Sequence, residues 1–297
     1  MPTDIQVKTI LNKTKKRDAW FLDDYTLNPY SGCSFNCRFC YIRGSKYGEH
    51  MEEKLSVKVN APELLAKQLS LRAKKGQYGI IVLSSATDPY LQFEAEYKLT
   101  RQLLEIILAY RFPVHIITRS SLVARDFDLL QEINKKAILP PDLEDKLLHK
   151  AIISFSFSTI DDKIAAIFEP GATPPSQRIE TVKAALDAGL HTGISMMPLL
   201  PYITDTTESL EAMFGCFKDL GVQYAMPATL TLFGNGPADS RTLVFREVAR
   251  HYPHLLEKYE RLFPGGNTQM PAYYQEAFYK KMAELGLRYG LPNRILD

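Results

Sequence analysis

Short runs of β-branched and apolar residues alternate with amphipathic helical patterns along most of this 297-residue chain. Most runs are nearly continuous in apolar residues, which is typical of parallel strands covered on both faces. The predicted strands span residues 25–30, 79–85, 113–119, 151–157, 190–197 and 222–231. The predicted helices between them begin at Asn60 or span about 96–111, 122–136, 175–188 and 206–220. This order predicts right-handed parallel crossovers, in an open doubly wound sheet or a complete or partial barrel, with reactive groups at the carboxyl ends of the strands.

The pattern changes near residue 240 to two long predicted helices, over 241–262 and 270–289, with Pro264-Gly265-Gly266 between them. Three parts are therefore predicted. An N-terminal extension covers 1–24, an α/β barrel covers 25–238 and an all-helical C-terminal extension covers 239–297. We expect the helical extension to cover the barrel or to line its mouth.

Charge and hydropathy narrow the classes of partner. The chain has 36 Lys and Arg against 34 Asp and Glu, and its net charge of +2 gives no global reason to expect a polyanion, although a local basic stripe would suffice. The basic runs 13–17 and 72–75 are interpreted as solvated. Apolar stretches such as 79–83 are far shorter than the roughly 18 residues of a membrane span. Residues 1–16 are polar and basic, unlike a secretory leader, so no membrane partner and a cytoplasmic location are expected.

Three of the four cysteines lie together, directly after the first predicted strand. Cys33, Cys37 and Cys40 fall within one short loop, whereas Cys216 lies in a later helical pattern and is expected to be a core residue. A clustered trio in a long chain indicates a metal site rather than a disulfide framework. A structural zinc site needs four ligands, which the loop lacks. Three thiolates on a four-iron cube leave one iron open, and an open iron can bind the amine and carboxylate of a small molecule.

The spacing Cys-x3-Cys-x2-Cys, with Phe39 before the last cysteine and a β/α chain around it, resembles the radical S-adenosylmethionine (SAM) superfamily. The resemblance implies a partial (β/α)6 barrel and a [4Fe-4S] cluster on Cys33, Cys37 and Cys40. It also implies that the open iron chelates SAM. An electron from the reduced cluster then splits SAM, and the 5′-deoxyadenosyl radical abstracts hydrogen from a substrate.

Further segments narrow the resemblance to the spore photoproduct lyase-related group, often called DNA repair photolyase-like proteins. The similarity covers roughly residues 25–235. It is carried by residues 28–33, 40–41, 84–90, 117–120 and 154–159, by Glu169-Pro170 and by Arg178. This chain departs from the lyase at one position. The lyase returns hydrogen to its product from a cysteine at the end of the second strand, and this chain has Ser85-Ala86-Thr87 at that place. The missing thiol argues against the same hydrogen-return route, although a tyrosine such as Tyr90 could substitute for it.

Two arguments give candidate contacts to SAM: the resemblance, and the rule that reactive groups lie at the carboxyl ends of parallel strands, here called the strand-end rule. Hydroxyl groups at the end of the second predicted strand, 79–85, are expected to contact the amine of SAM. Arg119 is expected to pair with the carboxylate of SAM. The aromatic rings beside Cys40 are expected to contact the adenine. The full set is Phe39, Tyr41, Ser84, Ser85, Thr87, Thr118, Arg119, Ser156 and Ser158.

Each assignment has an alternative. Residues 84–88 could form a simple turn, Arg119 could lie on the surface, and the serines of the strand predicted over 151–157 could face water. Weaker substrate candidates are Asp88, Tyr90, Glu169 and Arg178, and no catalytic hydrogen donor is assigned.

Three functions follow as hypotheses. The first is a radical SAM enzyme with an unidentified substrate. Its electron would come from an external flavodoxin or ferredoxin, since the chain lacks cysteines for a second cluster. The second is a lyase of DNA photolesions, with nucleic acid as its substrate. The third is a non-catalytic iron–sulfur or zinc module that binds nucleic acid, for which binding would fall steeply with salt.

Overall fold

The core of the protein is a seven-stranded sheet, seen in a computed structural model that describes residues 2–45, 48, 51, 53–84 and 86–296. Six neighbouring strands are parallel and β2 pairs antiparallel with β3 at one edge. In sheet order the strands are β10 (Ala225–Thr229), β9 (His191–Leu199), β8 (Ala151–Ser156), β7 (Val114–Thr118), β6 (Ile81–Leu83), β3 (Tyr25–Leu27) and β2 (Leu11–Lys13). All six predicted runs contain a strand, and the parallel order confirms the partial (β/α)6 barrel.

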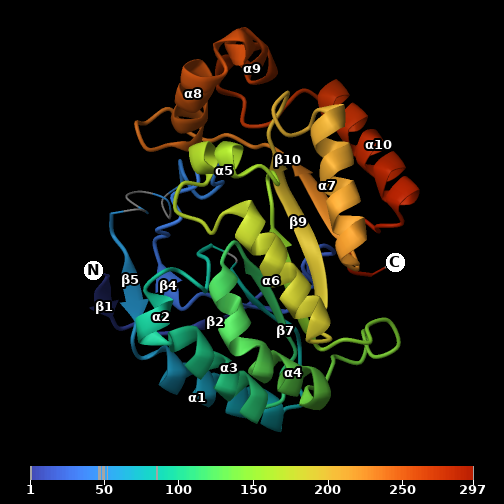
Figure 1. The fold of residues 1–297 in the computed structure, drawn as a ribbon. Coiled ribbons are helices and arrows are strands. Elements are labelled where there is room, and N and C mark those ends of the chain that lie inside the picture. Colours follow the sequence, from blue (N-terminus) through green and yellow to red (C-terminus); the bar gives the residue numbers. More distant parts are fainter. Residues whose placement is uncertain (1, 46–47, 49–50, 52, 85, 297) are drawn as a thin grey trace.

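Helices connect successive parallel strands and cover the outside of the sheet (Figure 1). They are α1 (Ala61–Lys74), α2 (Glu94–Tyr97), α3 (Leu99–Ala109), the 3-10 turn η1 (Ser121–Asp126), α4 (Phe127–Lys136), α5 (Asp162–Phe168), α6 (Pro175–Asp187) and α7 (Thr207–Leu220). The single helix predicted over 96–111 is wrong at its start. Lys98 adopts a left-handed conformation with φ of 50° and separates α2 from α3.

Alternation along the strands separates two apolar layers. Ile81 and Leu83 pack under the outer helices, whereas Val82 between them faces the barrel interior. An N-terminal turn also enters the interior, where Leu22 is buried and the carbonyl oxygen of Phe21 lies 2.9 Å from Nδ1 of His115. The segment predicted as an extension therefore fills part of the barrel.

The interior is tightly packed at Gly193 on β9. A Cβ built there would lie 2.2 Å from Cε2 of Tyr224, which is buried. We expect Gly193→Ala to lower the free energy of unfolding by about 2 kcal/mol, because the ring must shift in a filled core. Gly215→Ala on α7 is the matched control, since its nearest atom lies at 3.9 Å. Helix propensity predicts a gain of roughly 0.5–1 kcal/mol there, and urea unfolding that ranks the two variants equally would contradict this packing.

The strand predicted over 25–30 is divided in two. β3 ends at Leu27, and β4 (Tyr30–Ser31) leaves the main sheet to join β1 (Thr3–Ile5) and β5 (Ser56–Lys58) in order β1-β5-β4. Pro29 lies at the division and lacks the N–H that a continuing ladder needs. Consequently the cysteine loop begins after β4 of the small sheet rather than directly after β3.

The C-terminal part is helical, as predicted, but with different boundaries. The helix predicted over 241–262 is wrong, because Pro253 interrupts it. The elements are α8 (Ser240–His251), η2 (Pro253–Leu255), α9 (Leu256–Leu262), η3 (Pro264–Gly266) and α10 (Ala272–Tyr289). α10 packs beside α7 and β10, and α8 lies near α5 (Figure 1). Within the described ranges, no helix combines the length and apolar character needed to cross a membrane.

Candidate active site

The cysteine loop, residues 32–41, is held from both sides by backbone hydrogen bonds. The amide of Cys33 donates to the carbonyl of Met51 at 2.7 Å. On the other side, the amide of Arg38 donates to the carbonyl of Phe168 at 2.8 Å, and the amide of Gly171 donates to the carbonyl of Phe35 at 2.9 Å. A Cβ at residue 171 would lie 2.3 Å from the carbonyl oxygen of Ser34, so only glycine permits this approach. The segment 168–171 therefore braces the loop.

Arg43 supports the loop from within and was not predicted. Its side chain is fully buried, and Nε donates to the carbonyl of Cys37 at 3.1 Å. Nη1 donates to the carbonyl of Ala238 at 3.0 Å, and Nη2 donates to the side-chain oxygen of Asn36. The guanidinium thus ties the cysteine loop to the segment before α8. An arginine shortly after the last cysteine is the only sequence signal for this role.

A cavity of about 540 Å³ lies beside this loop at the carboxyl ends of the strands. All three clustered cysteines line it, together with most of the predicted SAM contacts. The predicted residues on its wall are Cys33, Cys37, Cys40, Phe39, Tyr41, Ser84, Thr87, Asp88, Arg119 and Ser156. The strand-end rule therefore locates one shared site from four different segments.

The cavity also has a wall that sequence reasoning missed. It comes from the N-terminal turn, through Asp18, Phe21 and Asp23, and from the ends of β9 and β10. Residues from those two strand ends include Ser195, Met197, Pro198, Ala228, Thr229 and Thr231. Only tertiary folding brings residues 18–23 to the barrel, so no local pattern marks them.

The segment after β6 is ordered by Asp88. This buried carboxylate accepts hydrogen bonds of 2.8 Å from the Thr118 hydroxyl, the Arg119 amide and the Tyr90 amide. Burial raises the pKa of Asp88 to about 6, although these hydrogen bonds act in the opposite direction. Asp88 therefore couples the end of β6 to the end of β7. Thr118 serves this link and does not line the cavity, and Ser85 lies outside the described residues.

Arg119 presents the cavity's one positively charged lining side chain among the described residues. Its Nη2 donates to the carbonyl of Met197 at 2.7 Å, and its guanidinium carbon lies 5.4 Å from the ring centroid of Phe39. Its Nη1 lies 3.5 Å from Oε1 of Glu169. These contacts hold a cation over the aromatic residue between the second and third cysteines. The surface-arginine alternative does not fit, because only 13% of this side chain is exposed.

The three serines of β8 and its extension divide between different tasks. Ser156 lines the cavity, as expected. Ser154 lies deeper in the barrel, where its hydroxyl is 2.7 Å from both Nε2 of His115 and the hydroxyl of Tyr224. Ser158 is buried and donates to Oε1 of Glu169. The serine face therefore points inward, with Ser156 as its member in the cavity.

The weaker substrate candidates other than Asp88 are located behind the cavity wall. Tyr90, Glu169 and Arg178 are each at most 2% exposed, and none of them lines the cavity. Tyr41 is the opposite case, since it lines the cavity and is 56% exposed. Cys216 packs partly buried on α7 against the core and is not part of the cavity wall.

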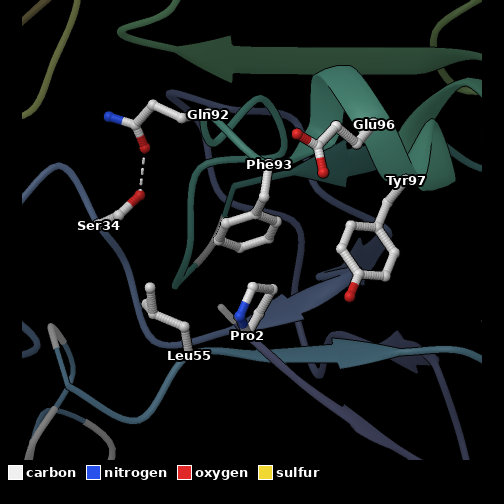
Figure 2. A pocket seen from close by; sticks show the side chains of 7 residues that line it. All are labelled: Pro2, Ser34, Leu55, Gln92, Phe93, Glu96 and Tyr97. Carbon is white, nitrogen blue, oxygen red and sulfur yellow. Dashed lines mark hydrogen bonds between the residues drawn. The ribbon is translucent and has the colours of Figure 1, made fainter.

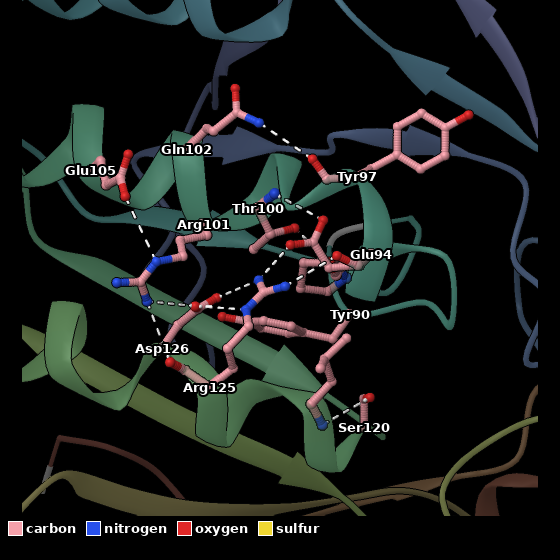
Figure 3. A network of polar contacts seen from close by, with 12 residues as sticks. Tyr90, Glu94, Tyr97, Thr100, Arg101, Gln102, Glu105, Ser120, Arg125 and Asp126 are labelled. Atoms are coloured by element: carbon pink, nitrogen blue, oxygen red, sulfur yellow. Dashed lines mark hydrogen bonds and ion pairs between the residues drawn. The ribbon is translucent and has the colours of Figure 1, made fainter.

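A buried polar network lies behind Tyr90 (Figure 3). The Glu94 carboxylate accepts hydrogen bonds from the Tyr30 hydroxyl and from the Thr100 amide, the latter at 3.0 Å. It also pairs with Nη2 of Arg125 at 2.5 Å, and Arg125 pairs with Asp126 at 2.8 Å. Through Tyr30 this network reaches the strand that leads into the cysteine loop. It joins β4, α2, α3 and η1 without touching the cavity.

A second hollow lies on the outer side of the cysteine loop (Figure 2). It is lined by Pro2, Ser34, Leu55, Gln92, Phe93, Glu96 and Tyr97. The Gln92 side chain donates to the carbonyl of Gly171 at 2.6 Å, which closes this side of the loop. None of the three cysteines lines the hollow, so it is separate from the candidate site.

The donor set of the cavity fits an iron–sulfur cluster. Cys33, Cys37 and Cys40 are free thiols on one wall, and no group of three or more His, Cys, Asp or Glu in the described ranges is close enough to hold a metal ion. A cluster of several irons is larger and takes thiolate ligands. Burial raises the pKa of all three thiols, that of Cys33 to about 12, whereas the charge of Arg119 lowers that of Cys37 and Cys40. Bound iron would supply the positive charge that keeps them ionised.

This combination defines a partial β/α barrel with a three-thiol loop at the mouth of its interior. The model of the radical SAM superfamily matches residues 27–213, and the chain belongs to that superfamily. An uncharacterized protein of Mycobacterium tuberculosis is 26% identical over 97% of this chain and 81% of its own length. The radical SAM Nalpha-GlyT isomerase of Pseudomonas phage M6 is 25% identical over 91% of this chain and 53% of its own length.

Solved structures share the fold. A mutant of spore photoproduct lyase with bound AdoMet and dinucleoside spore photoproduct superposes with a TM-score of 0.64 at 16% identity. The match covers 98% of this chain and 80% of the lyase chain. SuiB of Streptococcus suis bound to S-adenosylmethionine gives a TM-score of 0.52 at 13% identity over 91% of this chain and 48% of its own. The predicted similarity to the spore photoproduct lyase-related group is thus confirmed in the fold.

Proposed function

We propose that this chain is a radical SAM enzyme in which Cys33, Cys37 and Cys40 hold a [4Fe-4S] cluster and the adjoining cavity binds SAM. When bound, the cluster would supply the electron that cleaves SAM to a 5′-deoxyadenosyl radical, which abstracts hydrogen from the substrate. One observation carries the proposal: three free thiols and the ends of β6, β7 and β8 line the same cavity.

The residues on the cavity wall have separate tasks in this proposal. Arg119 pairs with the SAM carboxylate, because it is a positioned guanidinium on the wall. The hydroxyls of Thr87 and Ser156 offer hydrogen bonds to SAM. Phe39 and Tyr41 provide aromatic surface for the adenine ring. The apolar side chains of the wall exclude water, which protects a reactive radical from side reactions.

The electron donor is proposed to be a separate protein of the flavodoxin or ferredoxin type. Once three cysteines bind the cluster, only Cys216 remains, and it lies on α7 away from the cavity. The chain therefore has no thiols for a second cluster that could relay electrons. A cytoplasmic location belongs to the same proposal, since free cysteines persist in a reducing compartment.

The substrate class is narrowed by the charges of the cavity. Three aspartates line the cavity: Asp18, Asp23 and Asp88. Among the described lining residues, Arg119 carries the positive charge. A DNA lesion is suggested by the dinucleoside spore photoproduct bound in the lyase structure, yet a phosphate backbone would meet mainly acidic side chains here. We therefore propose a substrate whose reacting part is uncharged or cationic, and lesion-containing DNA is the alternative.

Metal analysis and spectroscopy test the cofactor assignment. Anaerobic reconstitution with iron and sulfide should give about four irons per chain and an electron paramagnetic resonance (EPR) signal after reduction with dithionite. Addition of SAM should change this signal, because SAM binds the open iron. One zinc per chain in the native protein, with steeply salt-dependent binding of nucleic acid, would instead favour the non-catalytic module.

A further inference from the structure

A buried cluster of three charged side chains lies beneath the cysteine loop. Glu169 stands between two arginines, with Oε2 at 2.7 Å from Nη2 of Arg178 and Oε1 at 3.5 Å from Nη1 of Arg119. Ser158 also donates a hydrogen bond to Glu169. The side chains of Glu169 and Arg178 are fully buried. One carboxylate therefore faces two guanidinium groups, and Asp88 is a further anion on the side of Arg119 that lies toward the cavity.

The position of Arg178 is tightly specified although its own side chain is not part of the cavity wall. Its Nη1 donates to the backbone carbonyl of Ser156, and its guanidinium carbon lies 4.7 Å from the ring centroid of Phe157. Its Nε is buried and has no hydrogen-bond partner among the residues that the structure describes. Burying a cation costs free energy unless an anion compensates it. Arg178 shares its carboxylate partner, Glu169, with Arg119, so a further anionic group nearby would stabilise its buried charge.

The cysteine loop is the neighbour that could carry this anion. Glu169 links Arg178 to Arg119. The guanidinium carbon of Arg119 lies 5.4 Å from the ring centroid of Phe39, two residues after Cys37. The carbonyl of Phe168, next to Glu169 in the chain, accepts the hydrogen bond from the amide of Arg38, next to Cys37. This backbone hydrogen bond thus fixes the position of Glu169 and its two arginines relative to Cys37.

We propose that Arg178 and Glu169 are positioning residues whose opposite charges beneath Cys37 tune the reduction potential of the iron–sulfur cluster bound to the cysteine loop, with Arg178 raising the potential and Glu169 lowering it. The proposal rests on the proposed function, because it requires that cluster. Its physical basis is that a nearby positive charge favours the reduced, more negative state of an iron–sulfur centre. Glu169 moderates the effect by neutralising one of the two arginines.

Two substitutions of opposite charge test this inference. Arg178→Met removes the buried cation and should shift the potential to a more negative value. Glu169→Gln removes the moderating anion and should shift the potential to a more positive value. Arg178→Lys keeps the charge with fewer hydrogen bonds and should stay near the wild-type potential. The measurement is an anaerobic redox titration of the reconstituted full chain without SAM, followed by EPR.

Glu132→Gln is the control for the loss of a carboxylate, because Glu132 pairs with Lys135 and Lys136 on α4 and does not border the cavity. It should leave the potential unchanged. Opposite shifts in Arg178→Met and Glu169→Gln support the inference. A potential that falls or stays constant in Glu169→Gln overturns it, even if Arg178→Met does not fold. If the wild-type chain assembles no cluster, the proposed function itself fails instead.

Discussion

Replacement of any one of the three clustered cysteines by serine is expected to abolish SAM cleavage. Cys33, Cys37 and Cys40 line one wall of the cavity, and the only other cysteine lies on α7 outside it. No fourth thiol can therefore replace a missing ligand. We expect iron and sulfide content and the visible absorbance of each reconstituted variant to fall to a small fraction of the wild-type value. Formation of 5′-deoxyadenosine should be lost in parallel.

Cys216→Ala provides the control for these variants. It removes a thiol of the same chemistry that packs partly buried against the core. Iron content and 5′-deoxyadenosine formation should remain at the wild-type level, because the residue is not part of the loop. Equal losses in Cys216→Ala and in the loop variants would contradict the assignment of the ligands.

The second large effect is expected on stability, from Glu94→Gln. Its fully buried carboxylate accepts a hydrogen bond from Thr100 and pairs with Arg125 (Figure 3). It also accepts a hydrogen bond from the hydroxyl of Tyr30. A glutamine amide keeps one acceptor oxygen and turns an N–H group toward these donors, so at least one buried hydrogen bond is lost and the free energy of unfolding should fall by about 2 kcal/mol. Urea denaturation of the apoprotein, followed by circular dichroism, measures the change.

Glu132→Gln is the matched surface variant. Glu132 pairs with Lys135 and Lys136 on the exposed side of α4, so water and salt already screen the pair. Its unfolding midpoint should stay close to that of the wild-type chain. A midpoint for Glu94→Gln that is equal to that of Glu132→Gln would show that the buried network does not stabilise the fold.

Much of the fold could be predicted because parallel strands covered by helices have a strong local signature. The six apolar runs and the helix that begins after Asn60 illustrate this. Two predicted elements are divided in the structure at a proline, which cannot donate a backbone hydrogen bond. Pro29 separates β3 from β4, and Pro253 ends the first helix of the C-terminal part. The three-residue strands β1, β2 and β5 carry too few residues for a period to be read.

The cavity residues that could be predicted from the sequence are those in the cysteine loop and those at the carboxyl ends of strands. Arg119 follows β7 and Ser156 ends β8, both at the carboxyl ends of predicted strands, and both line the cavity. Long-range packing explains what was missed. Asp18 reaches the cavity only because the N-terminal turn inserts into the barrel, and the pairing of Glu169 with Arg178 arises from folding of the segment between α5 and α6.

The central claim is that the three-thiol loop and the adjoining cavity together cleave SAM. The most direct measurement is quantification of 5′-deoxyadenosine by liquid chromatography and mass spectrometry. The assay contains anaerobically reconstituted wild-type chain, SAM and dithionite. The claim predicts 5′-deoxyadenosine that requires all three components and disappears in Cys37→Ser. A fully assembled four-iron cluster that yields no 5′-deoxyadenosine above the Cys37→Ser background would contradict it.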